Sequence, residues 1–291
     1  MLWNIVKLEC KKAICNKFFI LVVVIGIGIT FLSLIPSLES YLQDMEAHLR
    51  ISEEFGLRNP LMPMETLFNH WIGGEPHSTG SQDYFLLFPL LISIPYGWSY
   101  CAERRSGYEK NVVIRTGRLR YYFAKYLALF LSGGLAMVLP QLFNFLLAAM
   151  FFPAVTPSAV YDTAYGISAS SFMSMLFYTR PFLYVILYLF IDFLLCGLIA
   201  CLCFVLSVLV KRPVMVTLLP FFLLLGFSYL CQSFVYRSST VIYTELSPMT
   251  FLRATPATYD TNGFVVFGWA AVLFLLTFLP VVLRGIRHEI Y

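Results

Sequence analysis

Residues 181–210 read PFLYVILYLFIDFLLCGLIACLCFVLSVLV, a run of thirty residues in which Asp192 is the one charged side chain. About 20 apolar residues in a helix are enough to cross the hydrocarbon core of a bilayer. The run is long enough to span a membrane, and it therefore predicts an integral membrane protein.

The composition of the whole chain indicates the same class. Of its 291 residues, 59% are hydrophobic and 12% are charged, and the mean hydropathy is +0.77. A soluble domain carries about 25% charged residues, so this chain cannot cover a water-facing surface. The composition excludes a soluble enzyme, a nucleic-acid-binding domain and a disordered chain.

We expect an all-α polytopic membrane protein that forms a single transmembrane domain over residues 1–291. Six stretches are apolar enough to be transmembrane helices. The second is the weakest, because it is short and contains Pro89 and Pro95. The six predicted spans are 18–38, 84–102, 126–152, 181–210, 213–234 and 264–283.

Lys and Arg are distributed unevenly among the connections between these spans. Fifteen of the 20 lie in residues 1–17, in 103–125, in the Lys211–Arg212 turn and after the last span. The three long loops on the other side hold the remaining five, together with eleven acidic residues. Basic loops remain in the cytoplasm. Both termini are therefore expected on the cytoplasmic side.

Residues 1–17 predict a helix that lies in the plane of the inner leaflet. At 100° per residue, its apolar side chains form one stripe and its lysines lie off that stripe. The alternative, a positively charged topology signal, is less favoured. The apolar core of the first span exceeds the length of a signal-peptide core, so we interpret it as a retained anchor. The stripe consists of Leu2, Trp3, Val6, Cys10, Ala13 and Ile14.

The largest polar region is the first outer loop, residues 39–83. Its start, 39–55, predicts a helical extension of the first span, which Gly56, Pro60 and Pro63 then end. The loop also carries His48, His70 and His77, without the spacing of a metal site, so solvated surface is the favoured interpretation. In the later outer loops, the apolar patches 172–177 and 248–252 predict either short helices dipping toward the bilayer or loops packed on their own side chains.

Several kinds of chemistry are absent from the sequence. No phosphate-binding G-x-x-x-x-G-K-[ST], H-E-x-x-H or G-x-S-x-G motif occurs, so the chain is not expected to be an enzyme or to bind ATP itself. The seven cysteines predict no disulfide framework, because none lies in the long polar loops. We interpret Cys201 and Cys203 as packing residues rather than a metal or redox pair.

Asp192 is the single ionisable residue deep in a predicted span. A carboxylate at that depth costs about 2.5–3.5 kcal/mol on insertion scales, so it should face protein or water. One interpretation makes it a proton or cation relay. The other, which we favour, pairs it with Gln141 and Asn144, which lie at similar depth in the third span.

The most informative segment is the connection 103–125, which begins ERRSGYEK and is dense in basic residues. Its apolar Val112, Val113 and Ile114 form a ridge flanked by charges, which suits a short helix docking in a groove of another protein. The alternative is a solvated positive-inside loop. The candidate docking residues are Glu103, Arg104, Arg105, Gly107, Tyr108, Glu109 and Arg115.

This segment resembles the loop between spans two and three of ABC-2-type permeases, the membrane subunits of bacterial ABC exporters. In that family an E-[KR]-x-x-G element is followed by a coupling helix, a basic turn and a Lys near the start of the third span. The corresponding residues are Glu103, Arg104 and Gly107, then 108–116, then 117–120, then Lys125. The six spans, the amphipathic N-terminal helix and the 246–252 segment extend the resemblance, whereas the first outer loop is longer than a minimal member needs.

The resemblance implies a permease subunit in a bacterial plasma membrane. It would form the translocation path with a second permease chain, identical or related, and dock two ATP-binding subunits that hold the ATP and Mg²⁺. It would itself bind no cofactor and no metal. Peptides such as bacteriocins, drugs and lipid-like molecules are the substrate classes of the family. The alternatives are an ion-coupled carrier that uses Asp192, and a non-transport membrane subunit or membrane-embedded enzyme.

Overall fold

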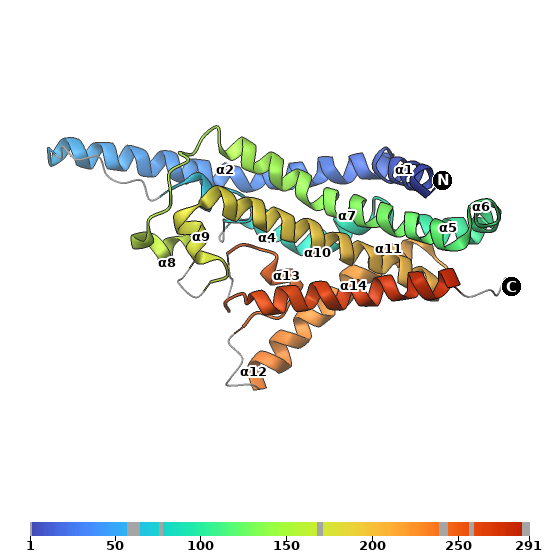
Figure 1. The fold of residues 1–291 in the computed structure, drawn as a ribbon. Coiled ribbons are helices and arrows are strands. Elements are labelled where there is room, and N and C mark those ends of the chain that lie inside the picture. Colours follow the sequence, from blue (N-terminus) through green and yellow to red (C-terminus); the bar gives the residue numbers. More distant parts are fainter. Residues whose placement is uncertain are drawn as a thin grey trace.

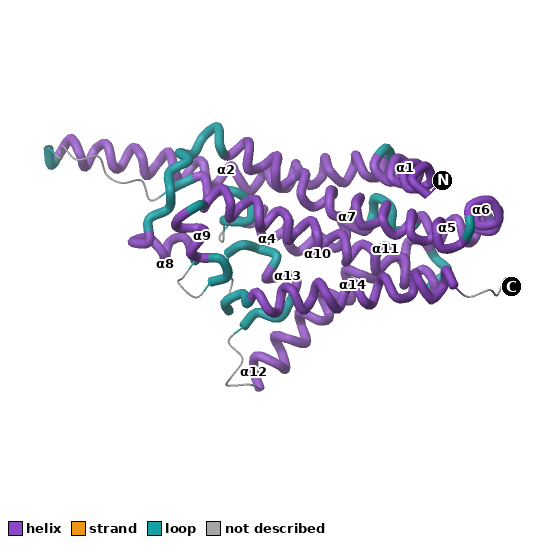
Figure 2. The backbone as a smooth tube through the Cα atoms, in the orientation of Figure 1, coloured by secondary structure: helices purple, strands orange, loops and turns teal. Residues whose placement is uncertain are grey.

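The fold is taken from a computed structural model that describes residues 2–56, 65–75, 78–167, 171–238, 244–255 and 259–286. The described part is helical, with a single isolated bridge between Thr244 and Asp260 and no strand (Figure 2). The longer helices run roughly side by side in one elongated bundle (Figure 1). The principal helices are α1 (Leu2–Ile14), α2 (Lys17–Glu54), α4 (Thr79–Ser93), α5 (Ser99–Ser106), α6 (Tyr108–Thr116), α7 (Arg118–Ala148), α10 (Pro181–Leu209), α11 (Pro213–Leu230) and α14 (Gly263–Ile286).

Short elements occupy the connections at one end of the bundle. Two of them, α9 (Ser174–Thr179) and α13 (Pro248–Phe251), overlap the apolar patches 172–177 and 248–252. Where they overlap, the secondary structure of these patches is therefore helical, as one of the two predicted alternatives required. A π-helical turn, Cys231–Val235, continues α11 into α12. The remaining short elements are α3 (Leu67–His70), a 3₁₀ turn (Ala159–Tyr161), α8 (Asp162–Tyr165), α9 (Ser174–Thr179), α12 (Tyr236–Ser238) and α13 (Pro248–Phe251).

Among the described residues, five helices are long and apolar enough to cross a membrane: α2, α7, α10, α11 with its π-helical turn, and α14. The second predicted span, 84–102, is not one helix, because α4 ends at Ser93 and α5 begins at Ser99. Pro95 lies in the break, and a proline has no N–H to continue a helical hydrogen-bond ladder. The count of six continuous spans is therefore not confirmed.

The first membrane-length helix, α2, is 38 residues long and continues past its apolar part. The predicted extension over 39–55 is confirmed, since α2 ends at Glu54 and Gly56 follows with a positive φ of 60°. Asn16 is the N-cap of the helix, and its side-chain oxygen accepts a hydrogen bond of 2.7 Å from the backbone N–H of Phe19. In Figure 1, α2 extends well beyond the other helices at the end opposite the N-terminus.

Helices α7 and α10 form the centre of the bundle, and glycines let their backbones approach closely. A Cβ at Gly133 would lie 2.3 Å from the Cβ of Ala200, and a Cβ at Gly134 would lie 2.7 Å from the backbone oxygen of Phe193. On the facing helix, a Cβ at Gly197 would lie 2.7 Å from the backbone oxygen of Phe130. Small residues at such crossings are typical of helix packing within membranes, where close contact replaces the hydrophobic effect.

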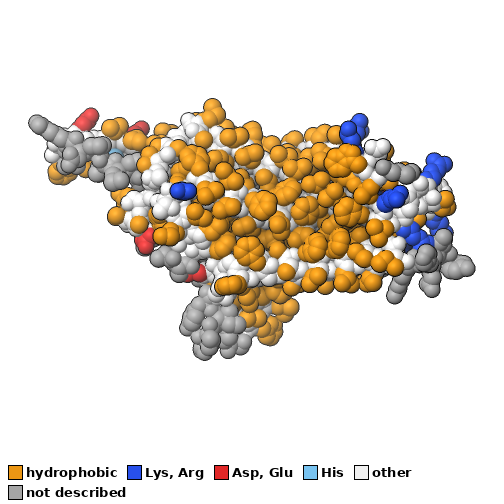
Figure 3. Space-filling view, in the orientation of Figure 1, with side chains coloured by type: hydrophobic (Ala, Val, Ile, Leu, Met, Phe, Trp, Pro, Cys, Tyr) orange, Lys and Arg blue, Asp and Glu red, His pale blue; other side chains and the backbone are white. Residues whose placement is uncertain are grey.

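Hydrophobic, basic and acidic side chains occupy different parts of the bundle surface (Figure 3). Hydrophobic side chains cover the middle of the visible face, Lys and Arg gather at one end, and Asp and Glu appear at the other. The end with the Lys and Arg side chains holds α1, α5, α6 and the C-terminal part of α14 (Figure 1), and we call it the basic end. An apolar belt between two polar ends is the pattern that a bilayer imposes.

Candidate functional site

The 103–125 connection folds as two short helices joined to α7 at sharp corners. Gly107 separates α5 from α6 with φ 74° and ψ 0°, and Gly117 separates α6 from α7 with φ 86° and ψ 143°. Glycine adopts such positive φ values without a steric cost. The predicted helix over 108–116 is present with those bounds. These corners turn α6 out from the end of the bundle (Figure 1).

Helix α6 exposes most of its surface, and none of its side chains is buried. Ile114 is 79% exposed, and Tyr108 and Arg115 are also exposed. The predicted apolar ridge is divided, however, because Val112 and Val113 are half-buried against the bundle while Ile114 faces outward. The outer face of α6 is therefore formed by Ile114 and the charged side chains beside it.

Glu109 connects α6 to the two neighbouring helices. Its Oε1 accepts hydrogen bonds from the hydroxyl groups of Tyr100, at 3.0 Å, and Tyr122, at 2.7 Å. These tyrosines belong to α5 and α7 respectively. These two hydrogen bonds within the chain hold the exposed helix in a fixed position.

The two arginines that follow Glu103 have different surroundings. Arg104 Nη1 donates to the backbone oxygens of Ser207, at 3.2 Å, and Val208, at 3.1 Å. These carbonyls belong to the last turn of α10, where a cation is favoured by the helix dipole. Arg105 is exposed and lines a cavity beside the turn between α10 and α11.

Glu103 belongs to a buried group of charges that we call the ionic cluster, consisting of Glu9, Lys12, Glu103 and Lys125. Lys125 Nζ lies 2.8 Å from Glu9 Oε2 and 2.8 Å from Glu103 Oε1, and the Lys125 side chain has 0% exposure. Lys12 Nζ lies 2.9 Å from Glu9 Oε1 and 3.8 Å from Glu103 Oε1. Two positive and two negative charges therefore neutralise each other where α1, α5 and α7 meet.

Two tyrosines complete the hydrogen bonding of the ionic cluster. The hydroxyl group of Tyr96 donates to Glu9 Oε2 at 2.6 Å and lies 2.9 Å from Lys125 Nζ, and the hydroxyl group of Tyr121 donates to Glu103 Oε2. Lys125 also lies over the ring of Tyr96, 4.7 Å from its centroid. Buried charges are tolerated when they are paired and hydrogen-bonded in this way.

The charges in the cluster shift the pKa values of its members on α1. Burial would raise the pKa of Glu9, but the positive charge of Lys125 and hydrogen bonds from Lys125, Tyr96 and Lys12 lower it below its usual value of 4.5. Burial would lower the pKa of Lys12, but its contact with Glu9 raises it above 10.5. Both groups are therefore charged near neutral pH.

Glu9 is the functional residue that the sequence analysis missed. It lies three residues after Val6 and four before Ala13, so it belongs to the same face of α1, and all three are buried. Within the predicted apolar stripe, Val6 and Ala13 are buried, whereas Leu2 is 40% exposed and Trp3 is 74% exposed. The buried face of α1 packs on α7. The sequence signal that could have identified this residue is an acidic side chain in the middle of an otherwise apolar helix face.

The polar residues of the third and fourth spans are separated into two sites. Gln141 Nε2 donates to Asp192 Oδ2 at 2.8 Å, and both side chains are buried, as the structural interpretation expected. Asn144 does not join them. Its amide bridges the backbone N–H of Ile72 and the backbone oxygen of Thr30, each at 2.8 Å, so it joins α7 to α2 and to the segment after α3.

The histidines of the 39–83 connection and the cysteines do not form a metal-binding group in the described ranges. His70 is buried, with its Nδ1 3.1 Å from Glu75 Oε2 and its ring stacked on Phe152; His48 is exposed, and His77 lies outside the described residues. No group of three metal-binding side chains forms among the described residues. Cys201 and Cys203 are buried, free thiols.

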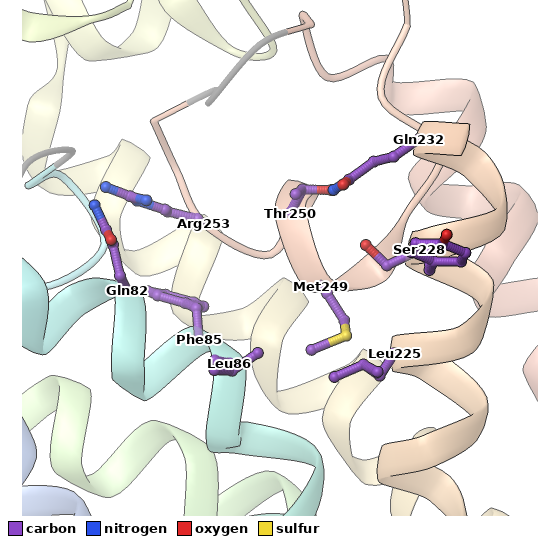
Figure 4. A pocket seen from close by; sticks show the side chains of 10 residues that line it. Gln82, Phe85, Leu86, Leu225, Ser228, Gln232, Met249, Thr250 and Arg253 are labelled. Carbon is purple, nitrogen blue, oxygen red and sulfur yellow. The ribbon is translucent and has the colours of Figure 1, made fainter. Parts of the chain in front are cut away.

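A second cavity lies at the end of the bundle opposite the basic end, between α4, α11 and α13, and has a volume of about 360 Å³. Its wall combines polar groups with an apolar surface (Figure 4). Arg253 borders it, and its Nη2 donates to the backbone oxygen of Glu75 at 2.9 Å. Burial lowers the pKa of Arg253. The lining residues are Gln82, Phe85, Leu86, Leu225, Ser228, Tyr229, Gln232, Met249, Thr250 and Arg253.

Polar side chains in the connection between α11 and α14 make contacts within the chain. Tyr236 donates its hydroxyl hydrogen to Glu245 Oε1 at 2.7 Å and accepts from the backbone N–H of Leu246 at 2.8 Å. Tyr243 lies outside the described residues. This part of the loop is thus held by its own hydrogen bonds.

No protein-family model matches the chain, and neither a curated protein nor a solved structure gives a match.

Proposed function

We propose that this chain is the membrane permease subunit of an ABC exporter of the ABC-2 type, which binds a separate ATP-binding subunit through α6. The observation that carries the proposal is α6 itself. It is a short helix with no buried side chain, yet both of its ends turn at glycines and Glu109 holds it to α5 and α7. A helix that is exposed and also firmly held is suited to transmit force from a partner.

The orientation of the chain follows from its charges. The basic end lies in the cytoplasm, because Lys and Arg remain on that side of a bacterial plasma membrane. The five membrane-length helices then cross the bilayer, and α4 and α5 together make the sixth passage on either side of the break at Pro95. With six passages, both termini lie inside.

The contacts of α6 define how a movement of the partner would reach the membrane. Glu109 connects α6 with α5 and α7, and the ionic cluster connects α5 and α7 with α1. Arg104 connects α5 with the end of α10. ATP binding on the partner would shift this group of helices between two arrangements, provided that the partner contacts them differently in each.

The cavity at the opposite end supports an amphiphilic substrate. It has an apolar surface that includes Phe85 and Met249, next to the polar groups of Gln82 and Arg253 (Figure 4). A peptide, drug or lipid-like molecule with a polar head and an apolar body has matching chemistry. A second permease chain would complete the translocation path.

Co-purification from the native membrane tests the proposal. The tagged protein is solubilised in mild detergent, and a stoichiometric ATPase is expected in the eluate. Two variants with the same change of charge are compared: Arg115→Glu on exposed α6, and Arg50→Glu near the far end of α2, where Arg50 is also exposed. Arg115→Glu should lose the ATPase, whereas Arg50→Glu should retain it.

Two results would overturn the proposal. One is a well-folded wild-type protein, monodisperse by size exclusion, that brings down no ATPase. The other is equal ATPase recovery with both variants. Transport driven by an ion gradient without an ATPase would instead favour a carrier that uses Asp192, whose buried Oδ1 has no hydrogen-bond partner among the described residues.

A further inference from the structure

The basic end contains a cavity of about 440 Å³ between α5 and the turn that connects α10 with α11. Four of its six lining residues are cations, and the other two are Cys101 and Ser207. No carboxylate lines it. We call it the basic pocket, and its cations are Arg104, Arg105, Lys211 and Arg212.

The positive charges of the basic pocket are not neutralised within the described part of the chain. None of the four cations forms an ion pair there, and the nearest acid in sequence, Glu103, is already bound to Lys125 at 2.8 Å and to Tyr121. All four cations are exposed, and Arg104 also donates to two backbone oxygens of α10. Like charges gathered around one cavity create a strong positive potential that an anion would relieve.

The backbone beside the pocket strengthens this potential. Lys211 and Arg212 directly precede α11, which begins at Pro213. The first N–H groups of a helix have no partner inside it and point toward its N-terminal side, where the helix dipole is positive. The basic pocket therefore combines arginine and lysine side chains with the N-terminus of an 18-residue helix.

Apolar side chains are exposed next to these cations. Leu209 is 77% exposed, Val214 is 68% exposed and Met215 is 49% exposed, and all three flank the turn between α10 and α11. A free phosphate ion would leave these surfaces unused. A phospholipid would place its phosphate among the cations and its acyl chains along the apolar flank. Basic pockets between transmembrane helices on the cytoplasmic side bind anionic lipid headgroups in this manner.

We propose that the basic pocket binds the phosphate headgroup of an anionic phospholipid. The phosphate accepts hydrogen bonds from Arg105 and from the cations of the 211–212 turn, and the lipid tails cover the exposed ends of α10 and α11. The assignment to the inner leaflet rests on the orientation proposed above, whereas phosphate binding rests on the pocket alone.

The test uses the purified, delipidated full-length protein and short-chain lipids with eight-carbon tails. Dioctanoyl phosphatidylglycerol is titrated against dioctanoyl phosphatidylcholine, with the shift of the thermal unfolding midpoint as the readout. The pocket variant is Arg105→Gln with Lys211→Gln. The control, Lys110→Gln with Arg120→Gln, removes two exposed charges from the same end of the bundle outside the pocket. Arg104 is kept in both variants, so the end of α10 remains capped.

We expect the anionic lipid to stabilise the wild type and the control at least tenfold more effectively, by concentration, than the zwitterionic lipid. In the pocket variant this preference should fall to threefold or less. An unchanged preference in the pocket variant would overturn the proposal. So would stabilisation by inorganic phosphate at the same concentrations as the lipid, which would identify a free anion as the ligand. If the double variant does not fold, Arg105→Gln alone, which loses no hydrogen bond within the described chain, gives the same comparison.

Discussion

Lys125 Nζ lies 2.8 Å from Glu9 Oε2, so a charge pair without access to solvent joins the first helix of the chain to α7. Replacing Lys125 by Met would leave Lys12 as the remaining cation of the cluster beside Glu9 and Glu103, so one negative charge would be uncompensated. Removing one partner of a buried pair typically costs about 3–5 kcal/mol. Lys125→Met should therefore lower the thermal unfolding midpoint strongly in detergent.

The control for this prediction is Lys110→Met, which removes an exposed lysine and should change the midpoint little. The double variant Glu9→Gln with Lys125→Met should recover part of the loss, because the charges of Lys12 and Glu103 then balance. An unchanged midpoint in Lys125→Met would show that the pair does not stabilise the fold.

The ionic cluster also predicts how stability depends on pH. The pKa of Glu9 is lowered on folding, so its contribution is present above its usual value of 4.5 and is lost as the pH falls through the lowered value. The pKa of Lys12 is raised, so its contribution is present below 10.5 and is lost as the pH rises through the raised value. Unfolding midpoints should be level between about pH 5 and about pH 10, and Glu9→Gln should weaken the decline on both sides, because Glu9 also raises the pKa of Lys12.

The two corners of α6 should respond differently to substitution. A Cβ at Gly107 or at Gly117 meets nothing within 4 Å, so the cost arises from the backbone alone. Gly107 lies in the left-handed helical region, which asparagine tolerates, whereas the conformation of Gly117 is accessible essentially to glycine only. Gly107→Ala and Gly117→Ala should each cost about 1–3 kcal/mol.

Substitution by asparagine should have different effects at the two glycines. Gly107→Asn should restore most of the stability and ATPase recovery that Gly107→Ala loses, and Gly117→Asn should restore neither. Hydrogen exchange of the α6 amides reports whether the helix keeps its position. Equal rescue at both glycines would contradict the backbone conformations described above.

The contact between α7 and α10 predicts a strong dependence on glycine. A Cβ at Gly134 would lie 2.7 Å from the backbone oxygen of Phe193, and a backbone atom cannot move aside as a flexible side chain can. Gly134→Ala should destabilise the protein by about 1–3 kcal/mol. Gly226→Ala in α11 is the control, because its Cβ would meet nothing within 4 Å, and it should be neutral or slightly stabilising. Thermal unfolding of the two variants in one detergent measures the difference.

Asp192→Asn tests whether the buried carboxylate has a structural or a coupling role. The asparagine side chain keeps an oxygen that can accept the hydrogen bond from Gln141, so folding and substrate export should both remain at wild-type level. Expression level and transport in membrane vesicles are the measurements. Normal expression with a complete loss of transport would show that the carboxylate carries a proton or cation.

The sequence predicted the helical elements well and their contacts less well, for physical reasons. The length of an apolar run and the glycines at the two ends of α6 act locally, so they can be identified in the chain before it folds. The break at Pro95 was missed, because the apolar run continues through it and predicts one span over 84–102. The pairing of Glu103 with Lys125 is different, because it depends on how α5 and α7 meet. The sequence also does not distinguish charged side chains that make contacts within the chain from exposed ones. Glu109 accepts a hydrogen bond from Tyr122, whereas Arg115 is exposed.

The basic pocket and the cavity near Arg253 illustrate the same limit. Each is lined by segments that are distant along the chain, and no spacing rule relates Arg105 to Lys211. Glu9 was missed for another reason. Its charge suggests a polar face, and only the packing of α1 on α7 shows that the side chain is buried.

The length of α2 has a mechanical consequence. At 1.5 Å per residue its 38 residues measure about 57 Å, nearly twice the roughly 30 Å thickness of the hydrocarbon core. A continuous helix of that length converts a small change of tilt into a large displacement of its far end. Pivoting by about 10° around Lys17 would carry Glu54 sideways by roughly 10 Å. A spectroscopic probe at the C-terminal end of α2 would therefore undergo a large displacement when the rearrangement within the bilayer is only slight.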